Sequence, residues 1–391
     1  MGPLPYVDDH SRYVEGKDSP WIRAKSSPSF NCSSFSNVPS MQERFLGWNV
    51  PQEHSNLVHP HWRGFLAPPK YMHLCVAIVY FLLMVMALVG NCCVVWIFST
   101  SKVLRTASNI FIVNLALFDL VMTMEIPMLI WSSFLERMVG WNTGCDIYAF
   151  LGAISVGIGS AFLPFSRGET ISCPIDGRLN SKQAAVIVLF TWFWASMFSF
   201  LPLFQVWGRY TTEGYLTSCS VDFLSDDQDT KVFVLAIFTW NYCIPMFLII
   251  YFYSQLIVSI RNHERMLREQ AKKMNVKSLV SNQDKERSVE LRIAKVAFTI
   301  FFLFLLAWTP YATVSLIAAF GDRNKLTPHV TMLPAVFAKV VSCIDPWIYA
   351  INHPRYRQEL QKRCKWMGIH EPEPVHETAS AQTEKLKSDE A

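Results

Sequence analysis

Seven long apolar runs constrain this chain more than any other feature of its sequence. A helix needs about 20 apolar residues to cross roughly 30 Å of hydrocarbon, and in lipid every backbone group needs an internal partner. The composition agrees, because only 17% of the residues are charged, whereas soluble domains carry about a quarter. We therefore predict an all-α membrane protein, a seven-transmembrane helix bundle, rather than a soluble protein with buried helices. The runs lie at about 72–98, 108–134, 143–165, 184–204, 231–257, 293–318 and 328–352.

Lysine and arginine gather in alternate connections between these runs. The loop after the fifth run and the segment after the seventh are rich in both, and the first loop holds Lys102 and Arg105. Cytoplasmic loops carry such an excess, so seven crossings place the N-terminus outside the cell. We expect a mostly irregular extracellular segment at 1–70, the membrane domain at 71–353, and a short amphipathic cytoplasmic helix with a tail at 354–391. The net charge of +4 is too small to indicate nucleic acid as a partner.

Four residues are candidates for covalent modification. Cys145 begins the third run and Cys219 lies in the loop after the fourth, on the side that the charge pattern makes extracellular. Because that compartment is oxidising, a disulfide between them is allowed, and two free thiols are the alternative. Asn31 begins a glycosylation sequon on the same side, and Cys364 lies among basic residues after the seventh run as a candidate for palmitoylation.

Four ionisable side chains fall within the apolar runs, where a charge is costly and therefore suggests a function. Lys339 lies near the middle of the seventh run, too far from either end to reach water easily. An amine removed from water is a better nucleophile toward an aldehyde, so Lys339 could carry a ligand as a Schiff base. A structural lysine paired with a carboxylate, or a transport residue, is the alternative that hydropathy leaves open. The other three side chains are Asp119, Glu125 and Asp345.

Asp119 and Asp345 form a group with Asn91, because all three lie at similar depth in the cytoplasmic half of their runs. Two carboxylates in a low dielectric cannot both stay charged without a cation or ordered water. We expect either a cluster bridged by water or sodium that rearranges on activation, or a static clasp between helices. Prolines inside five of the runs, Pro346 among them, indicate kinks of the kind that accompany switching.

The motifs resemble those of the rhodopsin-like receptors. Lys339, at its depth in the seventh run, resembles the retinal-binding lysine of opsins, and the run His353-Pro354-Arg355-Tyr356-Arg357 is similar to arthropod visual pigments. Residues 91–98, 172–178 and 271–287 are similar to insect short-wavelength opsins, most closely to lepidopteran blue opsins. The receptor motifs are Gly90-Asn91, Leu115-Ala116-Leu117-Phe118-Asp119, Trp192, Pro245, Ala307-Trp308-Thr309-Pro310-Tyr311 and Asp345-Pro346-Trp347-Ile348-Tyr349.

This resemblance implies a light-activated G-protein-coupled receptor rather than an enzyme, lying in the rhabdomeral plasma membrane. It implies a covalent 11-cis retinal or 11-cis 3-hydroxyretinal at Lys339, isomerised by light to the all-trans form. It also implies the Cys145–Cys219 disulfide, coupling to a Gq-type G protein and to arrestin, and no metal. The activation network would comprise Asn91, Asp119, Asp345, Pro346 and Tyr349, and the G-protein contacts would include Arg167 and Glu290.

The counterion and the colour also follow from the resemblance. Vertebrate visual opsins place a glutamate where this chain has Tyr148, so the loop residue Glu213, six residues before the loop cysteine, is the expected counterion. Glu125 stands where insect ultraviolet opsins carry lysine. A carboxylate there does not oppose a protonated Schiff base, which predicts visible, blue absorption. Trp308 and Tyr311 are expected to line the pocket.

The cytoplasmic end of the third run departs from the family pattern. Opsins carry Asp-Arg-Tyr there, whereas this chain has Ser166-Arg167-Gly168, preceded by Pro164 in a segment about four residues shorter than usual. Either coupling is altered, or the segment at 161–170 comes from a misplaced exon junction, which we favour. Such a helix is not expected to span easily in its usual register, which leaves signalling open. A retinal photoisomerase and a transporter are the rival functions; the chain shows no internal repeat of the transporter kind.

Overall fold

The computed structural model describes residues 44–172, 180–274, 298–299, 302–365 and 368. Its contacts separate 1–44 from a folded unit that begins at Phe45, and everything below concerns that unit. Asn31 and Glu290 lie outside the described residues. The side chains of Arg167 and Tyr349 lie outside them as well, although the backbone helices through both positions are described.

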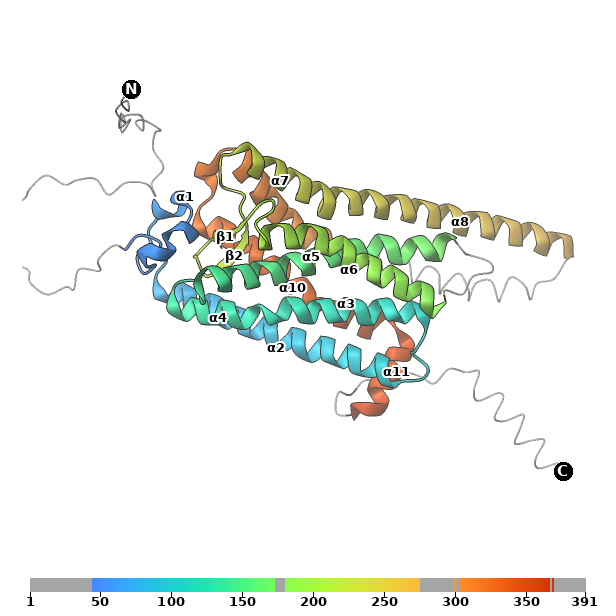
Figure 1. Cartoon of the computed structure of the whole chain (residues 1–391). Helices are drawn as coiled ribbons and strands as arrows, with labels where there is room; N and C mark the ends of the chain where they lie inside the picture. The colour runs from blue at the N-terminus through green and yellow to red at the C-terminus, as the bar shows by residue number, and fades with distance from the viewer. Residues whose placement is uncertain (1–43, 173–179, 275–297, 300–301, 366–367, 369–391) are drawn as a thin grey trace, which may run out of the picture. The chain divides into compact units, whose positions relative to one another are not determined.

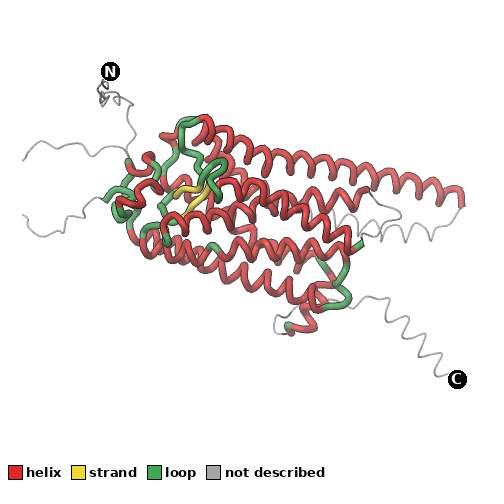
Figure 2. Tube along the Cα trace, in the orientation of Figure 1, coloured by secondary structure: helices red, strands yellow, loops and turns green. Residues whose placement is uncertain are grey.

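Long helices run side by side and form one bundle, as Figures 1 and 2 show. Each predicted run is helical over nearly all of its described residues, with a break at Glu125 in the second, so the seven-helix fold is confirmed. The spanning elements are α2 (Lys70–Thr100), α3 (Ala107–Met124) with α4 (Ile126–Leu135), α5 (Trp141–Ser172), α6 (Ser181–Leu203), α7 (Gln228–Phe238) with the π-helical turn η2 (Thr239–Cys243) and α8 (Ile244–Met274), the helix Phe302–Phe320, and α10 (Pro328–Asn352).

Short elements close the two ends of this bundle. The antiparallel hairpin of β1 (Tyr210–Glu213) and β2 (Ser218–Val221) lies at the same end as α1 (Pro60–Arg63), and α11 (Pro354–Arg363) lies at the other end (Figure 1). The remaining described elements are η1 (Gln52–Leu57) and η3 (Arg323–Lys325).

The outer surface of the bundle is apolar. Six of the spanning elements are long and apolar enough to cross a bilayer, and α2 alone exposes Leu74, Ile78, Phe81, Leu82 and Val85 among others. An apolar surface of this extent is unfavourable in water, so it faces lipid. The chain is a multi-pass membrane protein.

The second run is broken by a kink at Glu125. Pro127 follows at the start of α4, and because proline has no N–H, the carbonyl of Thr123 loses its regular helical partner. The break places Glu125 between α3 and α4, where it is buried with 1% of its surface exposed. The local sequence thereby turns an acidic side chain into the bundle.

Gly90 allows α2 and α10 to approach closely. A Cβ at this position would lie 2.9 Å from Pro346 Cγ, so any larger residue would force the helices apart. Next to it, Asn91 Nδ2 donates to the backbone carbonyl of Ser342 at 2.9 Å. The Gly90-Asn91 pair therefore fixes the register between these two helices.

The third run forms a longer helix than its sequence suggests. The backbone of α5 is helical from Trp141 through Pro164 to Ser172, which at 1.5 Å per residue is roughly 48 Å. A helix of that length can cross a bilayer, and the expectation about its usual register stays a prediction. Its side chains from Ile158 onward lie outside the described residues.

The amphipathic helix predicted after the seventh run is α11. It buries Tyr356 and Leu360 and exposes Arg355 and Lys362, so one face packs on the bundle and the other is charged. The Tyr356 ring stacks on Phe98 of α2 with centroids 5.2 Å apart. Burial raises the pKa of Tyr356, as expected for a phenol in an apolar contact.

Candidate functional site

A cavity inside the bundle brings together most of the residues that the sequence singled out. Its walls come from α3, Glu125 between α3 and α4, α5, α7, η2, the helix Phe302–Phe320 and α10, and the β1–β2 hairpin covers it. The lining is mainly apolar and aromatic, with a few polar groups, as is usual for a small-molecule site. Glu125, Tyr148, Glu213, Trp308, Tyr311 and Lys339 all line it.

Lys339 forms a buried ion pair with Glu125. The Nζ atom lies 2.8 Å from Glu125 Oε1, and the two side chains are 11% and 1% exposed. The rings of Tyr80 and Tyr148 lie 5.9 and 5.5 Å from the same amine. Among the lining residues of this mainly apolar cavity, Lys339 has the one primary amine, the group suited to covalent attachment of an aldehyde.

Glu213 is held by hydrogen bonds of its own. Its Oε2 accepts hydrogen bonds from Ser220 Oγ at 2.9 Å and from Tyr311 OH at 3.0 Å, and 4% of the residue is exposed. Burial raises the pKa of Glu213, and these hydrogen bonds and the charge of Lys339 oppose that rise only in part. Glu213, the expected counterion, is thus close enough to influence Lys339, but the carboxylate in contact with the amine is that of Glu125.

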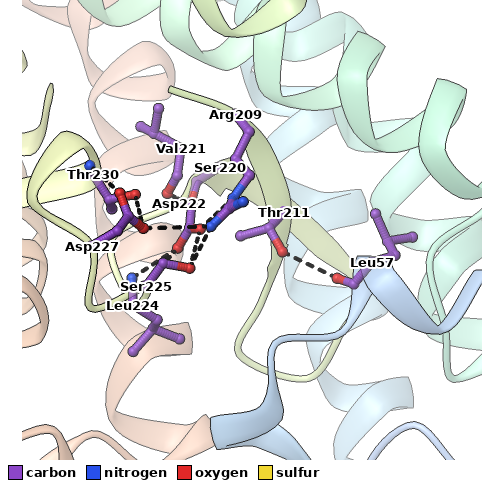
Figure 3. A network of polar contacts seen from close by, with 10 residues as sticks. All are labelled: Leu57, Arg209, Thr211, Ser220, Val221, Asp222, Leu224, Ser225, Asp227 and Thr230. Carbon is purple, nitrogen blue, oxygen red and sulfur yellow. Dashed lines mark hydrogen bonds and ion pairs between the residues drawn. The ribbon is translucent and has the colours of Figure 1, made fainter. Parts of the chain in front are cut away.

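The hairpin that carries Glu213 is fixed from several sides. The Cys145–Cys219 disulfide joins β2 to α5, as the sequence indicated. Trp62 Nε1 donates to the carbonyl of Thr212 at 3.2 Å. Figure 3 shows a second tie, in which Thr211 Oγ1 donates to the carbonyl of Leu57 at 3.1 Å. The cover of the cavity is therefore a rigid part of the fold.

A charged network holds the two ends of the hairpin together. Arg209 Nε donates to Asp222 Oδ2 at 2.7 Å, and Asp222 Oδ1 accepts from the backbone N–H groups of Leu224 and Ser225 (Figure 3). Burial alone would raise the pKa of Asp222, but the hydrogen bonds from Ser225, Arg209 and Leu224 hold that pKa below its usual value. Asp222 is therefore an anion at neutral pH that ties the chain before β1 to the chain after β2.

Asp119 and Asp345 lie close enough to interact, and Asn91 donates to the carbonyl of Ser342 in the helix that carries Asp345. All three are buried, with 0, 6 and 2% exposed, and Asp119 interacts electrostatically with Asp345. Asn91 Oδ1, Asp119 Oδ2 and Asp345 Oδ1 have no hydrogen-bond partner among the described residues. Ser342 is a further member, because its hydroxyl interacts with Asp119.

The sequence does not predict three of the residues found at the site. Tyr80 lies 11 residues before Asn91, about three helical turns, so it shares the inward face of α2, and that spacing is a signal that could have found it. Ser220 directly follows the loop cysteine, and nothing in its spacing marks it. Asn241 lines the cavity from η2, and its only signal is an amide inside an apolar run, four residues before Pro245.

Comparison with known proteins places this arrangement in a family. The family model described as 7 transmembrane receptor (rhodopsin family) matches residues 90–349. The blue-sensitive opsin of Apis mellifera is 72% identical over 357 residues, which are 90% of this chain and 94% of that protein. Opsin-3 of Manduca sexta is 61% identical over 348 residues, 87% of this chain and 90% of that protein.

A solved structure shares the fold. The crystal structure of squid rhodopsin matches with a TM-score of 0.76 at 30% identity, covering 83% of this chain and 94% of that chain. The relatives bear out the resemblance to insect short-wavelength opsins. The bee protein is more similar than the moth protein, so these identities do not favour the finer likeness to lepidopteran opsins.

Proposed function

Because the chain belongs to the rhodopsin family of seven-transmembrane receptors, as an insect short-wavelength opsin, we propose that it binds an 11-cis retinal covalently through Lys339. The family makes it a light-activated visual pigment and a G-protein-coupled receptor. The single observation that carries the proposal is the amine of Lys339, buried at the wall of an aromatic cavity.

The residues present fit a retinal group. The cavity is lined by rings and aliphatic side chains that suit a polyene, Phe238, Phe304 and Trp308 among them. When bound, the retinal supplies the light-driven change from the 11-cis to the all-trans form. The protein's part is to hold the nitrogen of Lys339, to exclude water with the fixed hairpin, and to place a rigid wall against the ligand.

Two carboxylates are available to balance the charge on the nitrogen of Lys339. A cation buried without a partner is strongly unfavourable, and one anion is enough to neutralise it. We propose that Glu125 supplies the larger share, because its oxygen lies 2.8 Å from the nitrogen. Glu213, the counterion proposed from the sequence, is the second acid, held further back by Tyr311 and Ser220.

The proposed colour is blue. Two acids beside the nitrogen favour its protonated form, and the protonated Schiff base of retinal absorbs visible light. The 72% identity to a protein named a blue-sensitive opsin supports the same assignment.

The proposed partners and orientation follow from the family and from the charge pattern. We propose coupling to a Gq-type G protein and to arrestin at the end of the bundle that carries α11, with the hairpin end and the N-terminus outside the cell in the rhabdomeral membrane. The basic loops support this direction. Cys364, a free thiol at the end of α11, remains the proposed palmitoylation site, and Asn31 the proposed glycosylation site.

The test is to locate the attached chromophore. The protein is reconstituted with 11-cis retinal, the linkage is reduced with borohydride, and the labelled peptide is sequenced; the label is expected on Lys339. Lys339→Ala should lose the label, and Lys325→Ala, which removes a lysine from η3, should keep it. Because Lys339→Ala leaves Glu125 as an unpaired buried charge, the double variant with Glu125→Gln serves as a folding control. Covalent label on another lysine, or on the double variant, would refute the proposal.

A further inference from the structure

One polar atom on the far wall of the cavity has no partner within the described part of the chain. Asn241 lines the cavity, and its Oδ1 is buried without a hydrogen-bond donor among the described residues. Buried polar atoms in native proteins are almost always paired, with protein, water or a ligand. An amide oxygen in this position therefore indicates that a molecule bound in the cavity donates a hydrogen bond to it.

The polar neighbours of Asn241 are satisfied by the protein itself. Tyr242 OH is hydrogen-bonded to Thr309 Oγ1 at 2.7 Å, and Ser315 Oγ donates to the carbonyl of Tyr311 at 3.1 Å. These bonds hold η2 and the helix Phe302–Phe320 together and leave those hydroxyls occupied. Asn241 is thus the polar side chain that this wall leaves available.

The backbone around Asn241 has an unusual geometry. Residues Thr239–Cys243 form a π-helical turn, in which the N–H of Ile244 bonds to the carbonyl of Thr239, five residues back. Such turns insert one extra residue and occur frequently at functional sites. Pro245 stands four residues after Asn241 and cannot donate the regular helical hydrogen bond to its carbonyl. The turn thereby brings Asn241 and Tyr242 together to the cavity wall.

Asn241 and Lys339 stand on opposite walls. Lys339 belongs to α10, which packs mainly on α2 and α3, whereas η2 packs on α5, α7 and α8. The cavity extends from one to the other. A rod-shaped ligand attached at Lys339 consequently directs its free end toward η2.

From this geometry we propose that Asn241 accepts a hydrogen bond from a hydroxyl on the ring of the chromophore, so that the site selects 3-hydroxyretinal over retinal. The inference rests on the proposed attachment at Lys339 and names which of the two chromophores the site prefers. When the ring lacks the hydroxyl, the buried amide oxygen has no hydrogen-bond donor, which is unfavourable. Sites with such a group discriminate against ligands that cannot form the hydrogen bond. The preference expected from one neutral hydrogen bond is roughly three- to tenfold.

The experiment is a competition between the two chromophores. The full-length apoprotein is incubated with equal amounts of 11-cis retinal and 11-cis 3-hydroxyretinal, and the bound chromophores are released, separated and quantified. Wild type is expected to contain the hydroxylated form in roughly three- to tenfold excess. Asn241→Leu, similar in size but without the amide, should reduce the ratio to about one. Asn241→Ala is the second variant in case leucine disturbs folding, and Ser315→Ala, whose hydroxyl already has a partner, should leave the ratio unchanged.

The outcomes separate the two proposals. A wild-type ratio near one, or a preference that survives both substitutions at Asn241, would overturn the role of this residue. Either result would indicate that water donates the hydrogen bond to the amide oxygen. Failure of the wild-type protein to bind either chromophore covalently would instead overturn the attachment at Lys339, and this inference with it.

Discussion

The charge balance at Lys339 gives the sharpest prediction, because it separates two carboxylates that both line the cavity. Replacing Glu125 with glutamine removes the anion 2.8 Å from the nitrogen while keeping the side chain's size. Removing one partner of a buried ion pair typically costs about 3–5 kcal/mol. Glu213 interacts electrostatically with the same nitrogen and offsets part of this loss. We therefore expect the protonated form of the nitrogen to lose about 3 kcal/mol of stabilisation.

The expected effect on the pigment is large and visible. Since about 1.4 kcal/mol corresponds to a factor of ten, the ratio of protonated to neutral Schiff base should fall roughly 100-fold. Glu125→Gln should therefore lose its visible band to the near ultraviolet at a pH about two units lower than wild type does. Acidification should restore the visible band, because the protonated form is favoured as the pH falls.

The assay is absorption spectroscopy of reconstituted pigment across a pH series, with Glu213→Gln as the matched variant. Glu213→Gln should shift the visible band and convert less of the pigment to the neutral form. If Glu125→Gln keeps its full visible band at neutral pH while Glu213→Gln loses it, the argument from contact distance is refuted and Glu213 alone is the counterion.

Three further predictions follow from the surroundings of the site. Gly152→Ala would place a Cβ 3.0 Å from Glu125 Oε2, so it should displace that carboxylate, move the absorption maximum and cost about 1–3 kcal/mol of stability in thermal unfolding. Cys219→Ala opens a disulfide that joins residues 74 positions apart, which should lower the free energy of unfolding by about 4 kcal/mol, measured as a loss of pigment yield and a lower Tm; an unchanged Tm would contradict the covalent tie. Burial would raise the pKa of Asp222, but hydrogen bonds from Ser225, Arg209 and Leu224 hold that pKa low. Asp222 therefore contributes to the free energy of unfolding above the ordinary pKa of aspartate, and this contribution is lost as the pH falls through the lowered value. Thermal bleaching should accordingly accelerate on strong acidification in wild type and depend less on pH in Asp222→Asn, and equal pH profiles would count against this network.

Much of the fold could be predicted from the sequence because the bilayer imposes local rules. A spanning helix needs a certain number of consecutive apolar residues, so the seven runs predict seven helices, and charges inside them stand out one by one. Lys339, Asp119 and Asp345 were singled out in this way. The cysteines could be paired because topology and compartment leave few choices, and the structure contains that disulfide.

The contacts between side chains of different helices could not be predicted in the same way. Helices surrounded by lipid are apolar on nearly every side, so periodicity does not say how each one is rotated. α2 illustrates this, since it exposes apolar side chains on its lipid face and buries Tyr80 and Asn91 on the other. The position of Glu125 likewise depends on the break before Pro127, which changes the direction of the helix. The composition of the run does not give that direction.

By itself, then, the sequence determined the seven spans, the position of Lys339 within the last of them, and the disulfide of the hairpin. Only the tertiary structure decided that the amine of Lys339 contacts Glu125, that Glu213 is bound instead by Tyr311 and Ser220, and that Asn241 Oδ1 has no hydrogen-bond partner among the described residues. The physical reason is that hydropathy acts along one helix, whereas an ion pair at 2.8 Å depends on the rotation, tilt and kinks of several helices at once.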